Sequence, residues 1–157
     1  MKTGVLWGAI VVVLDRATKC WAASALRAGS RTVIPGVLAF TYAENTGMAF
    51  SLLAGHPRIL AVASLALAAL VLVGLEGVLP RNRLCRALEG ALIGGGAGNA
   101  LDRLLYGYVI DFIEPLFMKF AIFNVADIAV TLSALVLAVA GCLMHTEEKR
   151  VGTQRSE

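Results

Sequence analysis

Charged residues are scarce in this 157-residue sequence. Asp, Glu, Lys and Arg make up 16% of the chain, against about a quarter in ordinary soluble domains. Apolar residues reach 58%, above the roughly 45–50% of soluble proteins. The composition therefore argues against a water-soluble globular domain and predicts one compact integral membrane unit.

Cysteine, histidine and clustered basic residues are also few. Cys20, Cys85 and Cys142 show no CxxC spacing, so neither a disulfide framework nor a zinc site is expected, and each is interpreted as a small buried residue. His56 and His145 fall in segments predicted for opposite sides of a membrane, which argues against a Ser or Cys triad. The 14 Lys and Arg residues are scattered. Nucleic acid is therefore not an expected partner.

Four apolar stretches are long enough to cross a bilayer, which takes about 20 helical residues. They cover approximately residues 4–26, 59–79, 84–105 and 123–144. We therefore expect an all-α membrane protein with a single integral membrane domain, residues 1–157, that forms a four-transmembrane-helix bundle. Residues 146–157 are expected to be a polar cytoplasmic tail. The first stretch is interpreted as a retained helix, because three charges precede its small-residue segment and a signal peptide lacks them there.

The distribution of basic residues predicts the orientation. Seven Lys and Arg residues fall on the side of the two termini and four on the opposite side. Because short cytoplasmic loops retain basic residues, both termini are expected in the cytoplasm. Between the first two stretches, residues 32–34 and 37–42 are rich in β-branched and aromatic residues and flank a Pro-Gly turn. They predict a small β-rich unit at the outer interface.

Several predicted spans contain polar side chains, although an ionisable group costs at least about 2.5 kcal/mol in the bilayer centre. Asp15 and Lys19 stand four residues apart, so they either neutralise one another structurally or serve a function. Two further groups each share one helix face: Asn99, Asp102 and Arg103 in the third stretch, and Asn124 and Asp127 in the fourth. These faces predict a shared polar interior. The glycine-rich run at residues 94–98 is interpreted as a surface for close helix packing.

Asp111 and Asp127 are the candidate catalytic pair. Asp111 follows the third stretch on a connecting loop, and Asp127 lies about 6 Å below the start of the fourth helix, so both face the extracytoplasmic side. Two carboxylates in a partly dehydrated site tend to share one proton. Such a pair can activate water for amide hydrolysis without a metal, a cofactor or a covalent intermediate. Spacing alone leaves open two unrelated carboxylates at helix ends.

Two other functions use the same residues. A small transporter or proton-relay protein would use the intramembrane Asp, Arg and Asn side chains as a relay. A metal-dependent phosphotransferase would use Asp111 and Asp127 as ligands. The sequence lacks the dense acidic cluster that a two-metal site usually needs, so this function ranks third.

Five motifs occur in order along nearly the whole chain. They are residues 15–19 (DRATK), 45–51 (NTGMAFS), 95–103 (GGAGNALDR), 107–112 (GYVIDF) and 123–127 (FNVAD). Together they resemble the motifs of the lipoprotein signal peptidase (signal peptidase II) family of bacterial inner-membrane aspartyl proteases. Two positions depart from that pattern: Arg16 stands where the family usually carries Gln, and residues 120–122 stand where a Trp-Pro-type segment is commoner.

The resemblance implies removal of signal peptides from prolipoproteins by cleavage just before a diacylglyceryl-modified cysteine, with Asp111 and Asp127 as the catalytic dyad. Residues implied to bind substrate or support the dyad are Asn45, Gly47, Asn99, Arg103 and Asn124, and the structural polar residues are Asp15, Lys19 and Asp102. It also implies an interfacial β-cradle and an active site near the extracytoplasmic face of the bacterial inner membrane. Prolipoproteins and membrane lipids are the expected partners. We expect a monomer, because the bundle satisfies its own polar groups.

Overall fold

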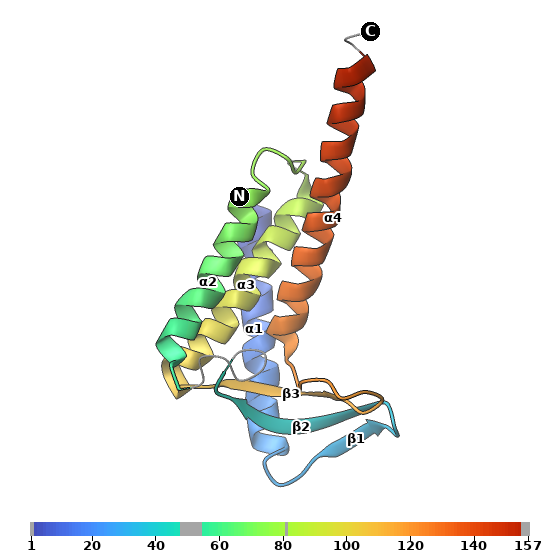
Figure 1. Cartoon of the computed structure of the whole chain (residues 1–157). Coiled ribbons are helices and arrows are strands. Elements are labelled where there is room, and N and C mark those ends of the chain that lie inside the picture. Colours follow the sequence, from blue (N-terminus) through green and yellow to red (C-terminus); the bar gives the residue numbers. More distant parts are fainter. Residues whose placement is uncertain (1, 48–54, 81, 155–157) are drawn as a thin grey trace.

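The computed structural model describes residues 2–47, 55–80 and 82–154, with side chains described as far as residue 144. This part of the chain forms four long helices and one small sheet. The helices are α1 (Lys2–Ala25), α2 (Pro57–Gly74), α3 (Arg83–Tyr106) and α4 (Val125–Gln154), and the strands are β1 (Arg31–Ile34), β2 (Leu38–Asn45) and β3 (Val109–Pro115). Figure 1 shows the helices side by side, with the sheet across one end and the α2–α3 connection at the other.

Polar side chains are buried in this bundle and apolar ones face outward. Asp15, Lys19 and Asp102 are fully buried. By contrast, large apolar side chains on each helix are more than half exposed, among them Val5, Leu70, Leu104 and Leu143. Within the described residues, two segments are long and apolar enough to cross a membrane, Pro57–Gly74 and Val125–Met144. Helices α1 and α3 each carry several charged side chains along their length.

Glycines allow α3 to pack closely against its neighbours. A Cβ atom on Gly94 would lie 2.5 Å from the carbonyl oxygen of Gly8 in α1, and one on Gly95 would lie 2.7 Å from the carbonyl oxygen of Ala126 in α4. Real Cβ atoms do not approach backbone so closely, so these positions require glycine. The close-packing interpretation of residues 94–98 is confirmed here.

The sheet joins two segments that are far apart in the sequence. Its strand order is β1-β2-β3, and both pairings are antiparallel. The hairpin of β1 and β2 forms where the sequence predicts strands. Residues 109–115, expected as a loop, form the third strand instead, and Ala43 pairs with Asp111. The prediction was wrong because the partner strand lies more than 60 residues away, so Asp111 sits on a strand that is hydrogen-bonded to β2.

Helix ends and cysteines also differ from expectation. Helix α2 ends at Gly74, before the expected residue 79, and Gly77 follows with a left-handed φ of 83°. Helix α4 continues to Gln154, so most of the expected polar tail is helical, because Glu, Lys and Arg are good helix formers.

The interpretation of each cysteine as a small buried residue is correct for Cys85 and wrong for the other two. Cys20 in α1 and Cys142 in α4 are exposed.

Candidate active site

The candidate site lies at the sheet end of the bundle, where β3 and the start of α4 meet α3. Asn124 precedes α4, and Asp127 lies in its first turn. The Asn124 Oδ1 atom accepts a hydrogen bond of 2.9 Å from the Asp127 backbone N–H, and Asp127 Oδ2 accepts one of 3.2 Å from the Asn124 backbone N–H. This reciprocal pair is a capping box. It orients the Asp127 carboxylate toward the helix start and the strand beside it.

Three asparagine side chains connect the two carboxylates. Asn124 Nδ2 donates to Asp111 Oδ1 at 2.6 Å, so the residue that caps Asp127 also binds Asp111. The other oxygen of Asp111 accepts a 2.9 Å hydrogen bond from Asn45 Nδ2 in β2. Asn99 Nδ2 in α3 donates to Asp127 Oδ1 at 2.7 Å. Each carboxylate therefore accepts two hydrogen bonds, and the network joins α3, α4, β2 and β3.

A buried ion cluster lies directly beneath this network. Lys19 Nζ is 2.8 Å from Asp15 Oδ2 and 2.9 Å from Asp102 Oδ2, and all three side chains are fully buried. The same ammonium donates a 2.8 Å hydrogen bond to Asn99 Oδ1. Because the amide oxygen of Asn99 faces Lys19, its amide nitrogen must face Asp127. The Asp15–Lys19 pair is thus part of the support for the candidate dyad as well as a neutralised pair.

The ion cluster also holds the backbone of both aspartate segments. Asp15 Oδ1 accepts a 3.1 Å hydrogen bond from the N–H of Ala126, and Asp102 Oδ2 accepts one of 3.3 Å from the N–H of Ile110. These are the residues immediately before Asp127 and Asp111. The sequence analysis missed both contacts, since a backbone N–H leaves no signal in residue type.

Two further residues acquire roles that the sequence did not assign. Arg16 pairs with Asp102 Oδ1 and lies 5.6 Å from the centre of the Tyr106 ring. A Cβ atom on Gly98 would lie 2.7 Å from Asp15 Oδ2, so this glycine leaves room for the buried carboxylate. The sequence signal for Gly98 was its place in a glycine run, which had been assigned to helix packing alone.

Arg103 connects the site to the segment after β2. Its Nη2 atom donates a 3.2 Å hydrogen bond to the carbonyl oxygen of Gly47, whose own N–H donates to Asn45 Oδ1 at 3.1 Å. The buried Nε atom of Arg103 has no hydrogen-bond partner within the described ranges. Residues 48–51 of the NTGMAFS motif lie outside the described residues.

Burial makes the carboxyl group of Asp111 a weaker acid than an ordinary aspartate. The side chain is 2% exposed, and burial raises its pKa from 3.8 to about 6, with the charge of Asp127 acting in the same direction. Hydrogen bonds from Asn45 and Asn124 oppose this shift. Asp111 is therefore suited to hold a proton beside an ionised partner.

Comparison with known proteins places this arrangement in a family. The family model for signal peptidase (SPase) II matches residues 8–143. The chain belongs to the signal peptidase II family. A lipoprotein signal peptidase from Syntrophomonas wolfei is 38% identical over 150 residues, covering 92% of this chain and 97% of that protein. Another from a Nostoc species is 36% identical over 143 residues, covering 88% of this chain and 90% of that protein.

Solved structures agree with the family assignment. One described as a bacterial membrane enzyme superposes with a TM-score of 0.80 at 28% identity, and the match covers 95% of this chain and 92% of that one. As a signal peptidase II, the chain is a hydrolase of the aspartic peptidase class. Both candidate aspartates and all three asparagines lie within the residues that the family model matches.

Proposed function

We propose that this protein removes signal peptides from diacylglyceryl-modified prolipoproteins by cleaving the peptide bond just before the lipidated cysteine. The observation that carries the proposal is that Asn124 binds both Asp111 and Asp127, by its side chain and its backbone N–H respectively. Family membership supports peptide-bond hydrolysis, and the names of the relatives support lipoproteins as the substrate class.

In the proposed mechanism Asp127 is ionised and Asp111 holds the proton. Asp127 takes a proton from water while the water oxygen attacks the scissile carbonyl carbon. Asp111 donates a hydrogen bond to the carbonyl oxygen, which carries the developing negative charge. The C–N bond of the tetrahedral intermediate then breaks, and the proton on Asp127 passes to the leaving amine. Arg103 donates to the carbonyl oxygen of Gly47 and thereby supports the segment after β2 beside the aspartates.

We further propose that all four helices span the bacterial inner membrane. Their exposed apolar faces and buried polar residues support this placement. Both termini then lie in the cytoplasm, and the three-stranded sheet forms a β-cradle at the extracytoplasmic interface. The diacylglyceryl chains remain in the lipid beside the helices, where each CH₂ contributes about 0.8 kcal/mol to anchoring. Only the peptide enters the polar site, and the protein acts as a monomer.

Cleavage of a synthetic precursor peptide by the purified protein tests this function. We expect mass spectrometry to show a single cut immediately before the lipidated cysteine, with unchanged rate in the presence of a chelator. The same peptide without its diacylglyceryl group is the control and is cut much more slowly. Chelator-sensitive cleavage would instead support a metal enzyme, and transport or proton conduction without any cleavage would support the relay function.

A further inference from the structure

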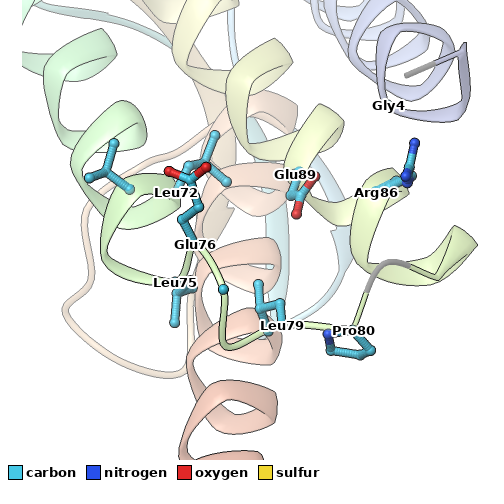
Figure 2. A pocket seen from close by; sticks show the side chains of 10 residues that line it. Gly4, Leu72, Leu75, Glu76, Leu79, Pro80, Arg86 and Glu89 are labelled. Atoms are coloured by element: carbon cyan, nitrogen blue, oxygen red, sulfur yellow. The ribbon is translucent and has the colours of Figure 1, made fainter.

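A second site lies at the end of the bundle opposite the aspartates. A cavity of about 410 Å³ is bounded by the start of α1 at Gly4, the end of α2, the turn that follows it and the first turns of α3. Figure 2 shows the side chains that line it. Its volume falls within the range of about 300–1,000 Å³ that is typical of small-molecule sites.

The cavity combines an apolar wall with three charged groups. Leu72, Leu75 and Leu79 provide the apolar wall. Glu76, Glu89 and Arg86 line the same space, and Figure 2 shows Glu76 in the turn after α2 and Glu89 and Arg86 on α3. None of these three side chains forms an ion pair with another described residue.

Carboxylates at the edge of an apolar region are favourable partners for a ligand cation, although Glu76 is exposed. Glu89 is half-buried, and burying an ionised group without a partner is costly. Among the described residues that line the cavity, Arg86 carries the positive charge, and one arginine cannot compensate two carboxylates. The charge pattern therefore fits a ligand that carries one positive and one negative group a few atoms apart.

We propose that this cavity binds the headgroup of a phospholipid with a primary ammonium, of the phosphatidylethanolamine type, from the leaflet at this end of the bundle. The ammonium would donate hydrogen bonds to Glu76 and Glu89, and the phosphate would accept from Arg86. The leucine wall would contact the glycerol and the first acyl carbons. Lipid has direct access, because Val73, which lines the cavity, is 67% exposed.

Other headgroups fit this charge pattern less well. A quaternary ammonium of the choline type has no N–H to donate to the two carboxylates. A glycerol headgroup with a net negative charge would be repelled by them. A divalent cation alone would satisfy the carboxylates and leave Arg86 without an anion. The proposal rests on the proposed membrane placement of the helices and is independent of the catalytic mechanism.

Lipid retention in nanodiscs tests the proposal. Wild-type protein in mixed phosphatidylethanolamine and phosphatidylcholine nanodiscs is compared with Glu89→Gln and Glu76→Gln by native mass spectrometry. We expect preferential retention of phosphatidylethanolamine by the wild type and about tenfold weaker retention by each variant, the effect of one lost charge-assisted hydrogen bond. Glu44→Gln, the same change of charge on the distant strand β2, is the matched control and retains the lipid as wild type does.

Three outcomes would overturn this site. One is equal retention of the ethanolamine and choline lipids by the wild type, and another is unchanged retention in Glu89→Gln. The third is thermal stabilisation in pure phosphatidylcholine nanodiscs by soluble phosphoethanolamine or by Mg²⁺ to the same extent as by the lipid. Cleavage of the lipidated precursor peptide by each variant verifies folding, so loss of the lipid site and failure of the proposed catalytic function are distinguishable.

Discussion

Lys19 has three partners in the candidate site. Its ammonium binds Asp15, Asp102 and the amide oxygen of Asn99. Through these three partners it reaches the backbone before each aspartate and the side chain that binds Asp127. One buried positive charge therefore supports both halves of the candidate dyad.

Replacing Lys19 by methionine removes this charge while keeping most of the side-chain volume. We expect a loss of about 3–5 kcal/mol in the free energy of unfolding, because Asp15 and Asp102 remain buried without their ammonium. Chemical unfolding in detergent, followed by circular dichroism, measures the loss. The double variant Lys19→Met/Asp15→Asn should recover part of it, since the carboxylate left without a cation is then neutral, whereas Asp102 keeps Arg16. A single variant as stable as the wild type would contradict the assigned role.

The raised pKa of Asp111 predicts a pH dependence of stability. The native protein binds this proton more tightly than the unfolded chain, whose carboxyl has a pKa near 3.8. The resulting stabilisation is fully present below that value and is lost as the pH rises through about 6, by on the order of 2 kcal/mol. Unfolding measured from pH 4 to pH 7 should show this loss in the wild type and a smaller one in Asp111→Asn. Identical pH profiles would refute the assignment.

At the scale of elements, the close contact between α1 and α3 sets the geometry of the site. The ion cluster is formed by side chains of both helices, so their separation determines whether Lys19 reaches Asp102. Aromatic side chains fix the other end of α1 to the sheet: the Trp21 ring lies 5.3 Å from Phe40 and 6.0 Å from Phe112 between ring centres. Helix α1 is thus held against both α3 and the sheet that carries Asp111.

Two glycines in the same helix provide a matched test of this contact. Gly94→Ala would place a methyl group 2.5 Å from the Gly8 carbonyl oxygen, whereas the nearest atom to a methyl group on Gly96 is 3.6 Å away. We expect Gly94→Ala to lower the free energy of unfolding by about 1–3 kcal/mol and to reduce activity by shifting α1. Gly96→Ala should be neutral or slightly stabilising, because alanine favours helix. Equal effects of the two substitutions would show that the helix contact does not control the site.

Local features were predicted from the sequence better than contacts between distant segments. These local features are the helices and the residue pairs that lie close together on one helix face. The helices, the β1–β2 hairpin and the polar faces around Lys19, Asn99 and Asn124 follow from local periodicity and residue type. The third strand did not, because β3 is stabilised by pairing with β2 rather than by its own propensity. The backbone contacts of Asp15 and Asp102 were equally inaccessible, since they depend on the separation of the helices.

The whole molecule combines a polar interior with an apolar exterior. The buried side chains of Asp15, Lys19, Asp102 and Asn99 form one polar cluster, while the outward faces of the helices present leucine, valine and isoleucine. In a bilayer this arrangement satisfies the charges internally and solvates the apolar faces with lipid. It leaves Asp127 half-buried at the sheet end of the bundle, where water and an extended peptide can approach.

This placement predicts a preference for substrates that reach the site from the lipid. Shortening the acyl chains of the precursor peptide should raise KM steeply and leave kcat nearly unchanged, because the chains contribute equally to binding in the ground state and in the transition state. Steady-state kinetics on a series of acyl lengths measures the effect. A KM that does not vary with acyl length would contradict entry from the lipid.

The most direct measurement is cleavage of the lipidated precursor peptide by Asp111→Asn and Asp127→Asn, compared with the wild type and with Glu114→Gln as a control on the same strand as Asp111. Each substitution keeps the size of the side chain and removes the acid. We predict that both aspartate variants fold with wild-type helical content and lose about 10²–10⁴-fold in kcat, the usual contribution of a general base or acid, whereas the control remains active. Normal turnover by either folded variant would contradict the dyad.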